Sequence, residues 1–216
     1  MSTRKRIQVP ESMADVTVGK YIQLVKANDP PKEGMEAVRL GIEILCGLPR
    51  PMVQRIAFAD IAKIARIMGK LIQPPKMEEY PLVPRFTLGN VEYGFVPDWS
   101  ELSLGEFVDL EEACKGDVWE HLPEILAIMY RPIVTSMGPL YEIAPYKPSP
   151  GQRDKMLECP MNVALGAMVF FYNTGKVFGR GTEPSSQGSN PRWAQSGGGI
   201  RLFMGWLKGI FSGLKR

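Results

Sequence analysis

Apolar residues recur every three or four positions through the first third of the chain, which is the period of helices with one buried face. This pattern predicts a helix that begins at Thr17, whose hydroxyl can cap it, and that ends at the proline pair of residues 30–31. Further helices are predicted over residues 33–47 and 51–73, and a second proline pair at residues 74–75 ends the latter.

The pattern changes to alternation over residues 84–97, which predicts a β-hairpin with its turn at Gly89 and Asn90. Residues 133–150 are rich in proline and glycine, so we expect loops there, with one short strand at residues 140–143.

Helical spacing returns after the hairpin, over residues 103–113 and 119–130. Ser103 and Glu106 have the spacing of a capping box at the start of the first of these helices. That start, SLGEFVDL, repeats the pattern of residues 17–24, TVGKYIQL. Two similar helix starts that arose independently explain this echo more simply than a duplicated unit does.

The most apolar stretch is residues 161–172, which we predict to form a helix buried on all sides. About a dozen residues are too few to span a bilayer, which takes about 20. Asn173, Thr174 and Gly175 are expected to end this helix. Residues 179–199 are mostly Gly, Ser, Pro, Gln and Asn, a composition typical of a flexible linker.

These elements predict a mostly α-helical α+β fold: a helical bundle with one β-hairpin, plus a tethered C-terminal amphipathic helix. The expected organisation is a flexible N-terminal segment over residues 1–14, a core domain over 15–178, the linker over 179–199, and the helix over 200–216. A chain of 216 residues with 44% hydrophobic residues is sufficient for such a core.

The predicted helix over residues 200–216 has a continuous apolar arc and contains no acidic residue. The arc consists of Leu202, Phe203, Trp206, Leu207, Ile210, Phe211 and Leu214. Outside it lie Arg201, Lys208, Lys215 and Arg216. Glycines at residues 205, 209 and 213 each cost about 1 kcal/mol of helix stability, so the isolated helix is marginal.

This helix is therefore expected to order on a surface, and three surfaces compete for it. It can dock on the protein's own core, on a partner protein, or in a membrane interface, where Trp206 and the cations would suit the headgroup region. We expect its apolar arc, together with Arg201 and Lys208, to form the partner- or membrane-binding site.

The net charge and the cysteine content indicate which kinds of binding partner and which cellular compartment we expect. The net charge is only +3, and no basic stripe interleaved with aromatic residues is present, which disfavours nucleic acid. The three cysteines are odd in number and widely separated, which favours reduced thiols in a cytoplasmic protein. The N-terminus lacks the apolar stretch of a signal peptide. The oligomeric state is left open.

The motifs of common catalytic sites are missing from the sequence. It has no phosphate-binding loop, no dinucleotide fingerprint and no nucleophile elbow. His121 is the single histidine and is interpreted as a residue of a helix surface or start. One histidine and three scattered cysteines also lack the short ligand pairs of zinc sites. We therefore expect no enzymatic activity and no catalytic residue, cofactor or metal.

Two charged features are interpreted mainly as structural. One is an acidic cluster expected to form a solvated helix face: Glu106, Asp109, Glu111 and Glu112. The other is Arg131, which follows an apolar helix, where a cation complements the helix dipole. Arg131 is expected to pair with a carboxylate such as Glu142, and the alternative is contact with a partner.

The order of several segments resembles small morphogenesis proteins of tailed bacteriophages, namely tail-assembly chaperones and baseplate-hub assembly proteins. The segments are TVGKYIQL, ILCGLP, FTLGNVEYGF, SLGEFVDLEE, EILAIMYRPI and ALGAMVFFYNTG. The resemblance covers residues 15–175, and its most distinctive parts are residues 107–110, 130–132 and 170–172. No functional residue is carried over from it.

This resemblance implies a non-enzymatic tail assembly factor or chaperone that binds structural tail proteins in the host cytoplasm. The alternatives are a peripheral membrane protein anchored by residues 200–216, and a minor structural protein of the virion.

Overall fold

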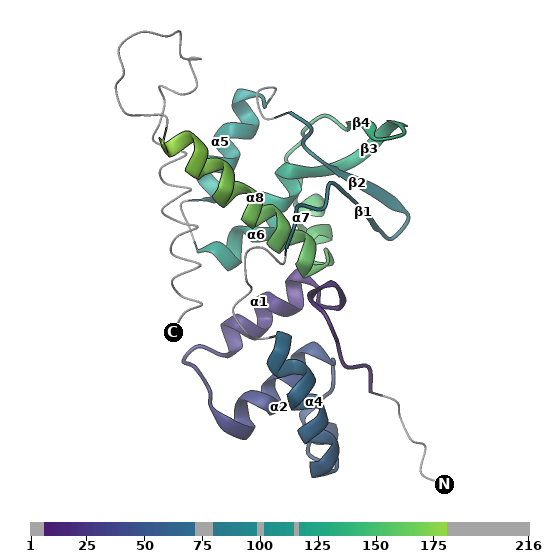
Figure 1. Ribbon diagram of the computed structural model, residues 1–216, viewed down its shortest axis with the longest axis vertical. Coiled ribbons are helices and arrows are strands. Elements are labelled where there is room, and N and C mark those ends of the chain that lie inside the picture. The colour runs from purple at the N-terminus through teal and green to yellow at the C-terminus, as the bar shows by residue number, and fades with distance from the viewer. Residues whose placement is uncertain (1–6, 72–79, 99–101, 115–116, 181–216) are drawn as a thin grey trace. The chain divides into compact units, whose positions relative to one another are not determined.

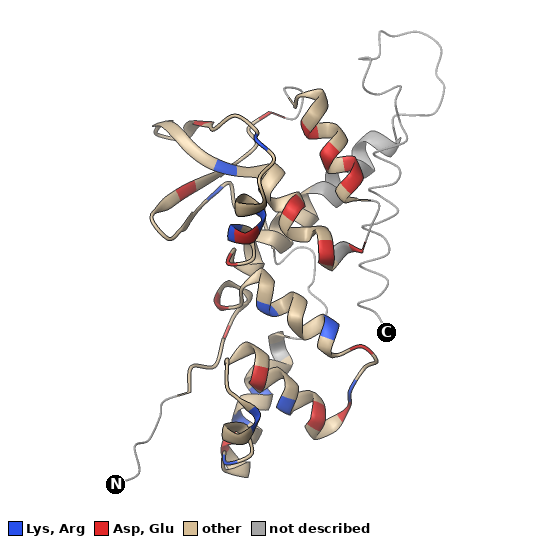
Figure 2. Cartoon of the chain, turned by 180° about the vertical axis from the view of Figure 1, so that it is seen from behind, with Lys and Arg blue, Asp and Glu red and all other residues tan. Residues whose placement is uncertain are grey.

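A computed structural model describes residues 7–71, 80–98, 102–114 and 117–180 (Figure 1; seen from behind in Figure 2). These residues form eight α-helices and one four-stranded antiparallel sheet, so the protein is mixed α+β, as predicted. The first six residues of the predicted N-terminal segment lie outside the described residues. So do the predicted linker from residue 181 onward and the whole predicted helix over 200–216.

The chain divides into two compact units. The first comprises Met1–Pro74 and Leu157–Asn162, and the second comprises Pro75–Met156 and Val163–Arg216. A short return segment late in the chain thus completes the first unit.

The first unit is helical. Its elements are a 3₁₀ turn at Met13–Asp15 and the helices α1 (Val18–Ala27), α2 (Gly34–Leu45), α3 (Arg50–Val53) and α4 (Phe58–Leu71). The Thr17 hydroxyl accepts a hydrogen bond from the Lys20 backbone N–H, which confirms the predicted cap. Val18, Ile42 and Met68 are among the side chains buried in its core.

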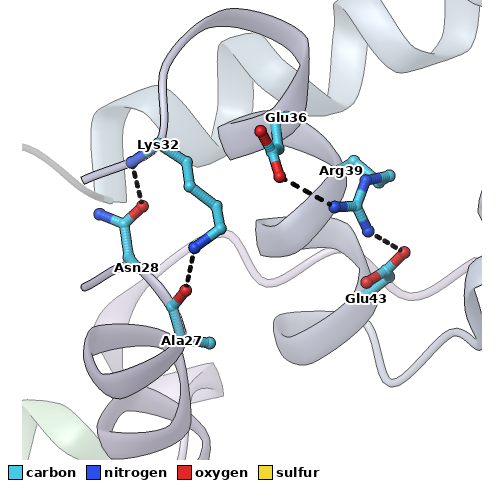
Figure 3. Close-up of polar contacts among 6 residues, drawn as sticks. All are labelled: Ala27, Asn28, Lys32, Glu36, Arg39 and Glu43. Atoms are coloured by element: carbon cyan, nitrogen blue, oxygen red, sulfur yellow. Dashed lines mark hydrogen bonds and ion pairs between the residues drawn. The ribbon is translucent and has the colours of Figure 1, made fainter. Parts of the chain in front are cut away.

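Polar contacts hold the connection between α1 and α2 (Figure 3). The Lys32 ammonium donates to the Ala27 carbonyl at the end of α1 at 2.6 Å, and the Lys32 backbone N–H donates to Asn28 Oδ1 at 3.1 Å. Lys32 therefore satisfies a carbonyl that the helix end leaves without an intrahelical partner. Within α2, Arg39 pairs with Glu43 at 2.7 Å and with Glu36 at 3.5 Å.

The prediction of one helix over residues 51–73 is wrong, because two helices occupy this stretch. The short helix α3 ends at Val53 and α4 begins at Phe58. Between them, Arg55 and Ile56 donate to carbonyls three residues back, which tightens the chain into a turn. No glycine or proline marks the break.

Residues 157–162 pair with the start of α1 through backbone hydrogen bonds. The Val18 N–H donates to the Cys159 carbonyl at 2.9 Å, and the Met161 N–H donates to the Val16 carbonyl at 2.8 Å. The Gly19 N–H donates to the Leu157 carbonyl at 2.8 Å, and a Cβ at residue 19 would lie 3.1 Å from that oxygen. A Cβ at this position would press on that carbonyl, so glycine favours the close backbone approach.

The second unit contains the sheet. Its strands are β1 (Arg85–Leu88), β2 (Val91–Phe95), β3 (Tyr130–Met137) and β4 (Leu140–Ile143), paired antiparallel in the order β1-β2-β3-β4. The first two strands confirm the predicted hairpin, and Gly89 in its turn has a φ of 60°. The strand at 140–143 is also confirmed. The loop expected over residues 133–137 is instead the end of β3, so the sheet contains more than the single predicted hairpin.

Four helices accompany the sheet: α5 (Leu104–Ala113), α6 (Val118–Met129), α7 (Pro150–Met156) and α8 (Met161–Arg180), the last contributing from residue 163 onward. Ring contacts join the sheet to α8, because Phe95 lies edge-on to Tyr130 at 5.1 Å and to Phe170 at 5.3 Å. Residues 163–168 of α8 are all buried, as predicted.

The predicted end of this helix at Asn173–Gly175 is wrong, since α8 continues to Arg180. The stop signal was weak, because a glycine inside a helix costs only about 1 kcal/mol and can be tolerated. No proline lies between residues 161 and 180 to break the helix.

Candidate functional site: an acidic cavity and an apolar hairpin

The residues predicted to bind a partner or membrane fall into two groups. Those of the C-terminal helix, from Arg201 to Leu214, lie outside the described residues. Arg131 lies on β3 and is only 8% exposed. Its guanidinium pairs at 2.7 Å with Glu106 on α5, a residue that is itself 5% exposed. The arginine is thus turned toward the protein's own carboxylate.

The sequence suggested Glu142 as the partner of Arg131, but the partner in the structure is Glu106. Its carboxylate also accepts a hydrogen bond from the Ser103 backbone N–H at 2.7 Å, while the Ser103 hydroxyl accepts from the Glu106 N–H, so the predicted capping box is confirmed. The expectation that Glu106 belongs to a solvated acidic face is wrong, because capping points its side chain inward, where Arg131 neutralises it.

Asp109, one helical turn further along α5, accepts a hydrogen bond from the Tyr146 hydroxyl at 2.8 Å. Burial raises the pKa of Tyr146, and the hydrogen bond to Asp109 raises it further. The phenol therefore stays neutral and holds the chain after β4 against α5.

An acidic cavity of about 660 Å³ opens beside this contact. We use this name for the hollow between α5, α6 and residues 146–153. Its polar lining is Asp109, Glu112, His121, Glu124, Tyr146, Ser149, Gln152 and Arg153. Its apolar lining includes Ala113, Ala127 and Ile128. The volume is in the range of sites that accept two or three large side chains or a small ligand.

Glu124 joins two walls of the acidic cavity. One of its carboxylate oxygens lies 2.9 Å from Arg153 Nε on α7, and the other lies 2.7 Å from Nδ1 of His121 on α6. His121 is thus a partly exposed residue near the start of a helix, as the sequence indicated.

The cavity as a whole has more negative than positive charge, because its lining contains three carboxylates and one guanidinium. Figure 2 shows acidic positions along α5 and near the start of α6. The hollow therefore combines apolar lining residues with an excess of carboxylates.

The thiols are poorly suited to nucleophilic chemistry. Cys114 and Cys159 are buried, and burial raises the pKa of each to about 12. Burial also raises the pKa of Cys46. At neutral pH the three sulfurs are therefore protonated. Among the residues that the structure describes, no group of three His, Cys, Asp or Glu side chains could hold a metal ion.

A second surface is the apolar hairpin, by which we mean residues 134–140 at the end of β3 and the start of β4. Both faces of the chain are exposed from residue 134 onward, so this part extends beyond the body of the sheet. Val134, Met137 and Leu140 are 61%, 74% and 73% exposed. The sequence offered a signal for the turn in Gly138 and Pro139, but none for the exposure of these side chains.

Arg85 on β1 clamps the apolar hairpin. Its guanidinium donates to the Ser136 hydroxyl at 3.0 Å and to the Gly138 and Leu140 carbonyls at 2.9 and 3.1 Å. It also lies 4.5 Å from the centre of the Tyr141 ring, in cation–π contact. These contacts fix the turn from outside the hairpin.

Tyr141 in turn is seated on the sheet. Its hydroxyl donates to the Phe95 carbonyl at 2.7 Å. Its ring covers Gly94, where a Cβ would collide with the ring, so glycine is needed there to admit the tyrosine.

Comparisons with known proteins found no matching family model, no matching curated protein and no matching solved structure. In the part of the chain that the structure describes, every helix is too short or too polar to cross a membrane.

Proposed function

We propose that this protein is a non-enzymatic assembly factor that binds structural proteins of a phage tail. The observation that carries the binding role is the apolar hairpin, which presents Val134, Met137 and Leu140 to solvent. Exposed apolar side chains gathered on one element are typical of protein-binding surfaces.

The clamp by Arg85 strengthens this interpretation. Three hydrogen bonds and a ring contact hold the turn in one conformation before any partner arrives. A preformed binding element loses less conformational entropy on association, so more of the apolar contact energy appears as affinity.

The assignment to tail assembly comes from the resemblance of residues 15–175 to phage morphogenesis proteins, and the host cytoplasm is the proposed site of action. The acidic cavity fits the same role, because its lining combines apolar side chains with an excess of carboxylates over cations. A chaperone that shields amphipathic segments of a structural protein needs surfaces of these two kinds.

Affinity capture from the native cells tests the proposal. Full-length protein serves as bait beside the Met137→Glu/Leu140→Glu variant, and bound proteins are identified by mass spectrometry. A matched control, Glu92→Gln/Glu142→Gln, changes two exposed strand residues without adding charge to the hairpin. We expect a structural tail protein to be enriched by the wild type and the control, and at least tenfold less by the hairpin variant.

Two outcomes would contradict the proposal. One is the absence of any tail protein from the wild-type capture. The other is sedimentation of the full-length protein with anionic liposomes while no protein is captured, which would favour the membrane-anchored alternative. Recovery of the chain in purified particles in stoichiometric amount would instead favour the minor virion protein.

A further inference from the structure

The tip of the apolar hairpin, by which we mean residues 137–140, is uncharged and projects from the sheet. Met137 and Leu140 are opposite partners in the register of β3 and β4, so their side chains lie together on one face beside the turn. Both side chains are largely exposed. No residue from 132 to 141 is charged. Because Arg85 fixes the turn, the hairpin tip is presented in one conformation.

The acidic cavity can accept such an uncharged group, because its carboxylates already have partners within the chain. Asp109 accepts a hydrogen bond from Tyr146, and Glu124 contacts the two basic side chains beside it. Glu112 also has an interaction partner. An occupant therefore needs no cation of its own, and an uncharged occupant leaves no charge in the cavity without a partner. The apolar lining that would contact it includes Ala113, Ala127 and Ile128.

The cavity also matches the hairpin tip in size. Its volume of about 660 Å³ corresponds to a cube with an edge of roughly 9 Å, and a pair of strands with its side chains is roughly 10 Å thick. The cavity therefore has room for the two apolar side chains of the hairpin tip, but not for the whole sheet.

One molecule cannot place its own hairpin tip in its own cavity. The strand β4 leads away from the tip, and the cavity lining includes Tyr146, which lies beyond the other end of that strand. Figure 1 shows the tip of β3 and β4 at one side of the second unit and α5 at the other. We propose that the hairpin tip of one copy of this chain docks in the acidic cavity of a second copy, with Met137 and Leu140 on the apolar lining.

This contact joins two different surfaces, so it is heterologous. Each copy in a row keeps a free hairpin tip at one end and a free cavity at the other, and association therefore continues beyond the dimer. A contact made by one hairpin tip buries less than the roughly 1,200 Å² of a stable interface. We therefore expect association that is reversible and depends on protein concentration.

Self-association goes beyond the proposed assembly role and does not depend on it. A structural partner that binds the apolar hairpin competes with the neighbouring copy, so the partner should disperse the associated protein. If copies of the chain do not associate, capture of a tail protein through the hairpin can still succeed. The two proposals can therefore fail separately.

Sedimentation equilibrium of the full chain tests the inference with two variants, each of which removes one side of the contact. Met137→Glu/Leu140→Glu places charge on the hairpin tip, and Gln152→Trp fills the cavity from α7. We expect the average mass of the wild type to rise with concentration across the micromolar range. Each variant alone should associate at least tenfold more weakly. The control Lys155→Trp, an exposed position of α7 outside the cavity lining, should associate as the wild type does.

An equimolar mixture of the two variants tests the geometry of the contact. The tip variant keeps an intact cavity and the cavity variant keeps an intact tip, so the mixture should form heterodimers and no larger species. Their formation would also show that both variants are folded. A wild type that stays monomeric, a Gln152→Trp variant that associates like the wild type, or a mixture that stays monomeric would each overturn the inference.

Discussion

At the scale of single residues, the ion pair of Glu106 and Arg131 is buried and connects two elements. The carboxylate has two tasks, since it caps α5 through the Ser103 N–H and neutralises the guanidinium on β3 at 2.7 Å. Both side chains are at least nine-tenths buried. If one partner is removed, the charge of the other therefore stays buried without a counter-charge and without water around it. The pair therefore joins α5 to the sheet.

Removing Arg131 alone should be strongly destabilising. Arg131→Met is expected to lower the free energy of unfolding by about 3–5 kcal/mol, because it leaves the Glu106 carboxylate buried without compensation. The second change Glu106→Gln should recover part of this loss, since glutamine can still cap the helix. Urea denaturation followed by fluorescence measures both effects.

The control for this prediction is Arg39→Met on α2, which breaks a pair of similar length at a more exposed site. It should cost about 0.5 kcal/mol. If Arg39→Met and Arg131→Met lowered the free energy of unfolding equally, the prediction that burial makes the second pair more important would be contradicted.

Tyr146 gives the protein a predicted weakness at alkaline pH. Its folded-state pKa is raised above the unfolded value of about 10, so its contribution to stability is fully present below that pH. As the pH rises further, the unfolded chain loses the phenolic proton first, and the contribution declines until the folded-state pKa is passed.

Tyr146→Phe should therefore lower stability by about 1 kcal/mol at pH 7, through loss of the hydrogen bond to Asp109. It should also make the fall in stability above pH 10 shallower. Thermal unfolding of both proteins between pH 7 and 11 measures this, and parallel curves would contradict the prediction.

At the scale of elements, the echo between the starts of α1 and α5 shows how one pattern serves two purposes. Each start has a capping hydroxyl, at Thr17 and Ser103, and each has a glycine at the second helical position. Gly19 admits the Leu157 carbonyl, whereas a Cβ at Gly105 would meet no atom closer than 4.0 Å. The glycine thus relieves a tight packing contact in α1 only.

Alanine substitutions at these two glycines should therefore differ. Gly105→Ala is expected to stabilise the protein by about 0.5–1 kcal/mol, because alanine loses less backbone entropy in a helix. Gly19→Ala should stabilise the protein less than Gly105→Ala does, or destabilise it, since the new methyl group presses on the Leu157 carbonyl. Denaturation midpoints of the two variants decide the matter, and an equal gain at both sites would refute it.

The elements that sequence analysis located correctly are those with local signals. Helix caps at Thr17 and Ser103 and the turn at Gly89 depend on residues close in sequence, and all three are present. The break before Phe58 and the length of α8 were missed because no proline or strong stop marks them. They depend on packing between distant segments, which a single sequence does not display.

The candidate site was less predictable than the fold for the same reason. The acidic cavity joins Asp109, His121 and Arg153, which come from three different helices, and its walls meet through Glu124. The sequence suggested that Arg131 pairs with a carboxylate, but its partner Glu106 lies on another element, distant in sequence. The apolar hairpin was not predicted, because residues 133–137 were expected to form a loop and nothing in the sequence indicates that Val134 and Met137 are exposed.

At the scale of the whole molecule, the chain combines a helical unit with a unit that presents binding surfaces. The second unit has the apolar hairpin, clamped by Arg85, and the acidic cavity between α5, α6 and residues 146–153. We propose that these surfaces bind a structural partner protein.

The central claim is that the apolar hairpin of the second unit binds a structural partner protein. Affinity capture with the full-length protein and its Met137→Glu/Leu140→Glu variant tests it most directly, with Glu92→Gln/Glu142→Gln as the control. We predict that the wild type and the control enrich the same structural protein and that the hairpin variant enriches it at least tenfold less. Equal enrichment by the wild type and the hairpin variant would contradict the claim.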